Sequence, residues 1–187
     1  MKKYIRENYK QIIAKFLIII LVLAVDLVTK VVFANLFTER FKNGNFDHII
    51  VIKDLLSFTY AENEGAAFSI FSGHVTFLII FSIIFIGLFV TIDFVFKEKS
   101  LWFVGGTALI IGGAIGNLID RVFLGYVRDF ISVDILKNFP ICNVADCCIT
   151  IGCICVFVYL ILQWVSDAKK KKLTLLNKPT KEDQNDN

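Results

Sequence analysis

The chain has 187 residues, enough for one compact domain, and 56% of them are hydrophobic, with a mean hydropathy of +0.68. A water-soluble protein of this size could not bury so much apolar surface, so the composition excludes that class and indicates a membrane protein. The net charge of +3 is small, and the positions of the charges are more informative than their sum.

Four uninterrupted apolar runs dominate the sequence, at residues 16–36, 74–96, 101–119 and 144–165. Each is close to the about 20 residues that a helix needs to cross a hydrocarbon core about 30 Å thick. Backbone groups in lipid must form their hydrogen bonds within the protein, so we expect four transmembrane helices that form an all-α bundle. The first run carries Asp26 and Lys30 and no small-residue cleavage site follows it, so we expect it to stay as a helix.

Lysine and arginine set the orientation of such a bundle, because they are enriched in cytoplasmic segments. Thirteen of them lie in residues 1–15, in the link 97–100 and beyond residue 165, whereas the connections 37–73 and 120–142 hold six. We therefore predict that both termini are cytoplasmic and that the two longer connections face outward.

The chain is expected to divide at residue 166. Residues 1–166 would form a single membrane-embedded domain with a long outer loop at 37–73. The tail at 167–187 is basic and polar, carries Pro179 and ends in "KEDQNDN", so we expect a disordered cytoplasmic segment.

Charged side chains within apolar runs are costly, at about 2.5–3.5 kcal/mol at a helix centre, and usually mark a functional site. The predicted orientation brings polar residues from three runs to the outer surface: Asp26, Lys30, Asn117, Asp120, Asn143 and Asp146. Asp129 lies in the outward connection between the last two runs. Asn117 and Asp120 are three positions apart, as are Asn143 and Asp146, and Asp26 and Lys30 are four apart. Each of these pairs therefore lies on one helix face, and Asp26 and Lys30 can form an ion pair. Only Asp93, near the inner end of the second run, departs from this pattern, and we interpret it as a boundary residue.

The outer loop at 37–73 contains a segment, 49–60, that is rich in β-branched and aromatic residues and predicts one or two short strands. The stretch "ENEGAAFSIF" follows at 62–71. A tight turn at Gly65 could present Asn63 toward the polar cluster, and an amide that both donates and accepts suits the binding of extended backbone. A simple turn is the alternative interpretation.

Five cysteines come late in the chain: Cys142, Cys147, Cys148, Cys153 and Cys155. All but Cys142 lie in the last run. No histidine is near them in the sequence, so we interpret these thiols as small apolar side chains and predict no metal site. Cys142 lies outside the run and has no evident disulfide partner.

The sequence shows no serine or cysteine nucleophile placed with a histidine base. Two neighbouring carboxylates, however, cannot both ionise cheaply, and a pair that keeps one proton can act as base and acid on a water molecule. This chemistry is peptide hydrolysis of the aspartic type. A proton- or ion-coupled transporter is the alternative, although its polar residues should span several depths. A non-catalytic membrane scaffold is a third possibility.

Five motifs resemble those of bacterial lipoprotein signal peptidase, signal peptidase II, in order over residues 25–165: "VDLVTK", "NEGAAFSIF", "GGAIGNLIDR", "VRDFI" and "NVAD". The resemblance implies an aspartic endopeptidase of the bacterial cytoplasmic membrane, with its active site at the outer leaflet. It also implies a small extracytoplasmic β-cradle and a short outer helix within the loop at 37–73.

The resemblance carries over to individual residues. It implies that Asp129 and Asp146 are the catalytic pair. It implies substrate-binding or supporting roles for Asn63, Gly65, Asn117, Asp120, Arg121, Asn143, Asp26 and Lys30. Among these, Asp120 would hold Arg121 or the loop, and Asp26 and Lys30 would be a structural pair. The residues "NFPIC" before "NVAD" depart from the usual aromatic pair around the proline, which leaves one wall of the pocket, at Cys142, undefined. Asp134 is interpreted as a loop acid.

The resemblance finally implies the substrate and the partners. The family removes the signal peptide of prolipoproteins just before a cysteine that already carries a diacylglyceryl group. We expect lipidated prolipoproteins and membrane lipids as partners, no nucleic acid, no cofactor and a monomeric protein.

Overall fold

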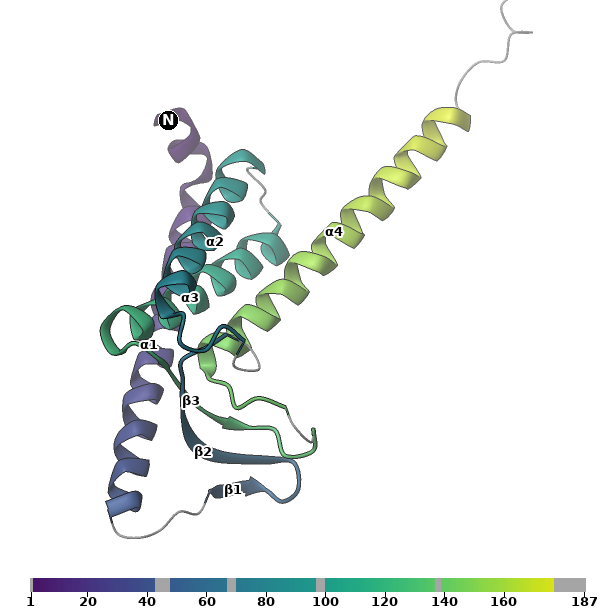
Figure 1. Ribbon diagram of the computed structural model, residues 1–187. Helices are drawn as coiled ribbons and strands as arrows, with labels where there is room; N and C mark the ends of the chain where they lie inside the picture. The colour runs from purple at the N-terminus through teal and green to yellow at the C-terminus, as the bar shows by residue number, and fades with distance from the viewer. Residues whose placement is uncertain (1, 43–47, 67–69, 97–99, 137–138, 177–187) are drawn as a thin grey trace, which may run out of the picture.

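The computed structural model describes residues 2–42, 48–66, 70–96, 100–136 and 139–176, and within its helices no side chain is described for residues 2–8, 39–42 and 175–176. The helices are α1 (Lys2–Lys42), α2 (Val75–Phe96), α3 (Leu101–Leu124) and α4 (Val144–Leu176), and the strands are β1 (Ile49–Ile52), β2 (Leu56–Asn63) and β3 (Val127–Ser132). Each helix contains a segment long and apolar enough to cross a membrane, which confirms the four predicted spans. Figure 1 shows the small sheet at one end of the bundle, near the start of α4.

Helix α3 is the centre of the bundle. It contacts α1, α2 and α4, and 67% of its most apolar stretch is buried inside the protein, against 17%, 6% and 17% for α1, α2 and α4. The outer three helices therefore expose most of their apolar side chains, as expected for surfaces that face lipid. In Figure 1, α4 runs away from the other helices toward its C-terminal end.

Two glycines of α3 allow its neighbours to approach closely. A Cβ atom on Gly113 would lie 2.5 Å from the backbone oxygen of Ala145 on α4. A Cβ atom on Gly116 would lie 2.5 Å from Oδ2 of Asp26 on α1. Small residues of this kind let helix backbones meet in a membrane, so these positions set the distance between the elements that carry the polar residues.

The sheet is antiparallel, in the order β1-β2-β3, and it is held on α1 by aromatic stacking. The ring centroid of Phe33 on α1 lies 4.4 Å from that of Phe130 on β3 and 4.6 Å from that of Phe58 on β2. Strands present alternate residues to opposite faces. With Phe130 packed against α1, the adjacent Asp129 therefore points to the other face of β3.

Strands β1 and β2 confirm the strands predicted at 49–60, but β3 was not predicted. The segment 120–142 was expected to be a loop, although its residues "VRDFIS" have the β-branched and aromatic content of a strand. A single antiparallel bridge from Ile131 to Cys142 extends this pairing toward α4.

Two helix boundaries differ from the prediction. Helix α3 continues to Leu124 rather than ending at residue 119, because charged residues end an apolar run without breaking helical hydrogen bonds. The helix ends at Gly125, whose φ is 84°. Asp120 and Arg121 are therefore helical. Helix α4 continues to Leu176, so the predicted disorder of 167–187 is wrong for residues 167–176, where lysine and leucine are good helix formers. Residues 177–187 lie outside the described part of the chain.

The predicted short outer helix is not found as a separate element in the described residues 64–66 and 70–74, which form turns. Instead α1 is longer than the expected span 16–36 and continues to Lys42. The motif residues 67–69 lie outside the described part.

Candidate active site

A buried lysine of α1 connects this helix with α3 beneath the site. Nζ of Lys30 lies 2.8 Å from Oδ2 of Asp26 and 3.4 Å from Oδ2 of Asp120, and it donates a 2.9 Å hydrogen bond to Oδ1 of Asn117. The side chains of Lys30 and Asp26 are fully buried. The predicted ion pair between them is thus confirmed.

The remaining contacts of the acids extend this network to the other elements. The backbone amide of Ala145, in the first turn of α4, donates to Oδ1 of Asp26 at 2.9 Å. Asp120 accepts three bonds from Arg128 of β3: from Nη2 at 2.6 Å, from Nε at 3.2 Å and from the backbone amide at 3.1 Å. Asp120 was expected to hold Arg121 or the loop, and these bonds connect it to Arg128 in the segment that was expected to be that loop.

Arg128 is a supporting residue that the sequence interpretation missed. It lies between Val127 and Asp129 in the motif "VRDFI", and a strand would have placed it on the face opposite Asp129. Its bidentate bond to Asp120 fixes the position of β3 relative to α3, and so the position of Asp129. The neighbouring Asp120 raises the pKa of the Arg128 guanidinium, against the effect of its burial.

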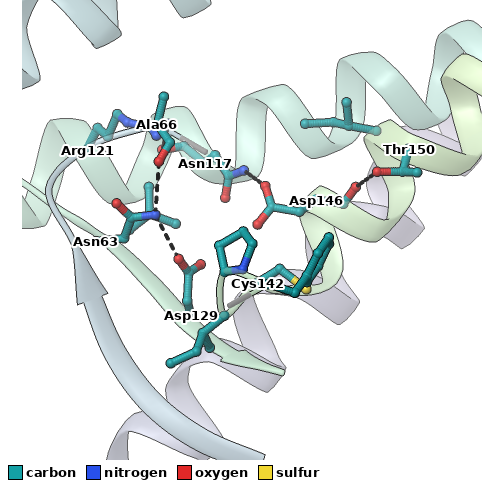
Figure 2. A pocket seen from close by; sticks show the side chains of 13 residues that line it. Asn63, Ala66, Asn117, Arg121, Asp129, Cys142, Asp146 and Thr150 are labelled. Atoms are coloured by element: carbon teal, nitrogen blue, oxygen red, sulfur yellow. Dashed lines mark hydrogen bonds between the residues drawn. The ribbon is translucent and has the colours of Figure 1, made fainter. Parts of the chain in front are cut away.

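Asn143 and Asp146 begin α4 as a reciprocal cap. The amide of Asp146 donates to Oδ1 of Asn143 at 2.9 Å, and the amide of Asn143 donates to Oδ2 of Asp146 at 3.2 Å. This is the arrangement of a capping box, which explains the three-residue spacing. Nδ2 of Asn117 donates to Oδ1 of Asp146 at 2.8 Å (Figure 2). Both oxygens of Asp146 therefore have donors, in a first turn where the helix macrodipole favours negative charge.

Asp129 is held by two asparagine amides. Nδ2 of Asn143 donates to its Oδ1 at 2.6 Å, and Nδ2 of Asn63 donates to its Oδ2 at 3.0 Å. Asp129 as a whole residue is 2% exposed. Burial, followed by the charge of Asp146, raises the pKa of Asp129 to about 7, and the two amide bonds oppose the rise.

The turn predicted at Gly65 is present and directs Asn63 toward Asp129. Oδ1 of Asn63 accepts a 2.9 Å bond from the amide of Gly65, which leaves its Nδ2 to face the carboxylate. Nη2 of Arg121 donates to the backbone oxygen of Gly65 at 2.9 Å, so α3 holds the turn in place.

These side chains surround a cavity of about 270 Å³, shown in Figure 2, which is lined by Asn63, Ala66, Asn117, Arg121, Val127, Asp129, Phe139, Pro140, Ile141, Cys142, Asp146, Ile149 and Thr150. The two carboxylates of Asp129 and Asp146 thus share one space, although they are 17 positions apart in the sequence. Cys142 supplies the wall that the sequence had left undefined. Two carboxylates on one cavity, one with a raised pKa, have the arrangement required for acid–base action on a water molecule.

The other acids singled out in the sequence lie elsewhere. Asp93 forms an ion pair with Lys15 at the far end of the bundle. Asp134 accepts bonds from Ser57 at 2.9 Å and from Ser132 at 2.7 Å on the sheet, and these hydroxyls lower its pKa. Within the described ranges, no three His, Cys, Asp or Glu side chains are grouped so that they could hold a metal ion.

Comparisons with known proteins find relatives of a single family. The family model described as "Signal peptidase (SPase) II" matches residues 18–162. The lipoprotein signal peptidase of Lactobacillus gasseri is 44% identical over 133 residues, which are 71% of this chain and 84% of the relative. That of Clostridium tetani is 39% identical over 149 residues, 79% of this chain and 92% of the relative.

A solved structure gives the same result for the fold. A bacterial membrane enzyme determined by the in meso method at 2.3 Å resolution matches with a TM-score of 0.70 and 33% identity, over 90% of this chain and 94% of that one. None of these matches supports the transporter alternative. With a family model that covers most of its length and relatives of this similarity, the chain belongs to the signal peptidase II family.

Proposed function

We propose that Asp129 and Asp146 are the catalytic pair with which this multi-pass bacterial membrane peptidase removes signal peptides from prolipoproteins. The observation that carries the proposal is the link through Asn143, which donates to Asp129 from its side chain and caps α4 together with Asp146. One residue thereby holds both carboxylates at the same cavity. The aspartic type of hydrolysis follows from their pairing and is consistent with the family.

The two acids have different surroundings, and we assign them different roles. Asp129 lies in a buried position that raises its pKa to about 7, so we assign the shared proton to this acid. Asp146 receives two donors in the first turn of α4, so it is the charged partner. A water molecule between them loses a proton to Asp146 as its oxygen bonds to the scissile carbonyl carbon. As the tetrahedral intermediate collapses, the C–N bond breaks and Asp129 gives its proton to the leaving amine.

The cavity adjoins an apolar groove that suits a signal peptide. The groove has a volume of about 230 Å³ and runs along α2, where it is lined by Leu78, Phe81, Ser82 and Phe85. It shares Ala66, Asn117, Arg121 and Ile149 with the catalytic cavity. An apolar segment in this groove would deliver its next residues directly to the carboxylates. The side chains of Arg121 at the junction and of Asn63 in the cavity are suited to hold the extended backbone there.

The orientation in the membrane is part of the proposal. The distribution of lysine and arginine, thirteen against six, supports cytoplasmic termini and a site at the outer leaflet of the cytoplasmic membrane. At that depth the acyl chains of a diacylglyceryl cysteine could stay in the bilayer while its peptide bond reaches the cavity. That binding energy would position the substrate.

Cleavage of a lipidated precursor tests this function. The purified protein in detergent micelles should cleave a prolipoprotein peptide before its diacylglyceryl cysteine, and a chelator should leave the rate unchanged. The same peptide without the lipid should be cleaved more slowly. Equal rates for the two peptides would contradict the proposed role of the lipid, and absence of cleavage of both would contradict the function.

A further inference from the structure

Two cysteines enclose the segment that carries Asn143 and Asp146. Cys142 precedes the capping asparagine and lines the catalytic cavity, and Cys147 lies in the first turns of α4. In a capped helix the side chains directly before the cap and four residues after it pack against each other. The cap that orients the catalytic pair therefore also brings these two thiols together.

At these two positions beside the cap, the side chains of Cys142 and Cys147 are close enough to affect each other's charge. Both cysteines are half-buried, and neither forms a disulfide. Cys153 and Cys155 of α4 are two positions apart and so do not face each other on a helix.

The backbone of Cys142 is fixed to the strand that carries Asp129. Its carbonyl oxygen accepts from the amides of Phe130 at 2.9 Å and Ile131 at 2.8 Å, and its amide donates to Ile131 at 3.0 Å. The amide of Cys147 donates to the oxygen of Asn143 at 3.2 Å. Any change in the separation of the two sulfurs is therefore transmitted to Asn143 and to both carboxylates.

We propose that Cys142 and Cys147 are a modification site, at which an extracytoplasmic disulfide compound oxidises the two thiols to a disulfide and so lowers the peptidase activity. The inference rests on the proposed function, because it requires that the cavity is catalytic and faces outward. A bond of about 2.0 Å between the sulfurs is much shorter than their non-bonded contact. Its formation draws the segment 142–147 together and displaces Asn143 from Asp129.

The exchange reaction balances without a further reactant. The thiolate of Cys147 attacks one sulfur of the oxidant RS–SR, forms a mixed disulfide and releases one RS⁻. The thiolate of Cys142 then attacks the sulfur of Cys147 and releases the second RS⁻. The cysteines lose two electrons, RS–SR gains them, and the two thiol protons end on two RSH. The contact with Cys147 and its burial raise the pKa of the Cys142 thiol, which assigns the first attack to Cys147.

The test uses the full chain in detergent micelles, treated with oxidised glutathione or with a reductant. Peptide mass spectrometry should find a disulfide that joins residues 142 and 147 only in the oxidised sample. Cleavage of a lipidated precursor should fall about 100-fold, the scale expected when a catalytic group is misplaced by about 1 Å, and reductant should restore it.

Matched variants separate this site from other thiols. Cys147→Ala should keep the basal rate and lose the response to oxidised glutathione, whereas Cys148→Ala should keep both. The proposal is overturned if no disulfide joins 142 and 147, if that disulfide leaves the rate unchanged, or if Cys147→Ala is inhibited like the unmodified sequence. Should the reduced protein cleave nothing, the proposed function fails, while the disulfide mapping still decides whether the dithiol site exists.

Discussion

The side-chain amide of Asn143 donates a 2.6 Å hydrogen bond to Oδ1 of Asp129. The same residue caps α4 through its Oδ1, which accepts from the amide of Asp146. Asn143 therefore has two separable functions, one in orienting Asp129 and one in starting the helix.

The substitution Asn143→Ser separates these functions. Serine is a good N-cap but cannot reach Asp129, so the helix should keep most of its stability. Loss of a hydrogen bond to a charged or polarised group costs about 1.5–3 kcal/mol, so kcat should fall about 10–100-fold. Cleavage kinetics together with thermal unfolding would measure both effects. A loss of folding stability that accounts for the whole loss of activity would contradict the orienting role.

Lys30 should be the most sensitive position for folding. The substitution Lys30→Met leaves the fully buried Asp26 without its ion-pair partner, and breaking such a pair costs about 3–5 kcal/mol. Unfolding in detergent with increasing denaturant would report the loss. Lys15→Met is the matched control, since its pair with Asp93 is only partly buried, and it should cost less. Similar losses for both variants would contradict the importance assigned to the network beneath the site.

The pH dependence of the rate should report the protonation of Asp129. Because the pKa of Asp129 is raised to about 7, the carboxyl group loses its proton as the pH rises through 7. A role as proton donor then requires kcat to fall above about pH 7, by up to about tenfold per pH unit. The control variant Asp134→Asn should show the same dependence of kcat on pH as the parent protein, because Asp134 lies on the sheet outside the cavity. A rate that rises through this range would reverse the assignment of the two acids.

The same shift has a consequence for stability. Asp129 binds its proton more tightly in the folded state than in the unfolded state, where its ordinary pKa of 3.8 applies. Its contribution to stability is therefore present at low pH. That contribution is lost as the pH rises from about 4 to about 7, because the folded state binds more protons than the unfolded state there. Comparison of thermal unfolding of the parent and of Asp129→Asn across this range should show that the variant lacks this part of the decline. An identical pH dependence would contradict the raised pKa.

The apolar groove along α2 predicts an effect on substrate binding alone. Ser82→Trp should fill the groove and raise KM about tenfold, which corresponds to about 1.4 kcal/mol of binding, with little change in kcat. Ile84→Trp places the same side chain on the exposed face of α2, where Ile84 is 65% exposed, and should leave KM unchanged. Equal effects of the two substitutions would exclude the groove as the path of the signal peptide.

Much of the fold could be predicted because a helix that crosses lipid requires a long, nearly continuous apolar run. The four helices, the strands at 49–60, the ion pair of Asp26 with Lys30 and the turn that presents Asn63 all follow from short-range patterns. The ends of α1, α3 and α4 did not follow, since hydropathy marks where a chain leaves lipid and not where helical hydrogen bonds stop.

The partners of the site residues were harder to predict than the residues themselves. Asp120 pairs with Arg128, eight positions away, only because β3 folds back against the end of α3. The contact of Cys142 with Cys147 depends on the cap at Asn143. The first is a consequence of tertiary placement that no spacing in the sequence specifies, and the second requires knowledge of the residue at which the helix begins. The pairs three or four positions apart were within reach of helix geometry.

The central claim is that Asp129 and Asp146 act together on one water molecule. The most direct test is the rate at which Asp129→Asn and Asp146→Asn cleave a diacylglyceryl precursor peptide, with Asp134→Asn as the control and folding checked by thermal unfolding. Each of the first two variants should lose at least about 100-fold in kcat, the lower part of the range for general acid–base catalysis, while the control retains the parent rate. A folded Asp129→Asn or Asp146→Asn protein with the parent rate would contradict the account.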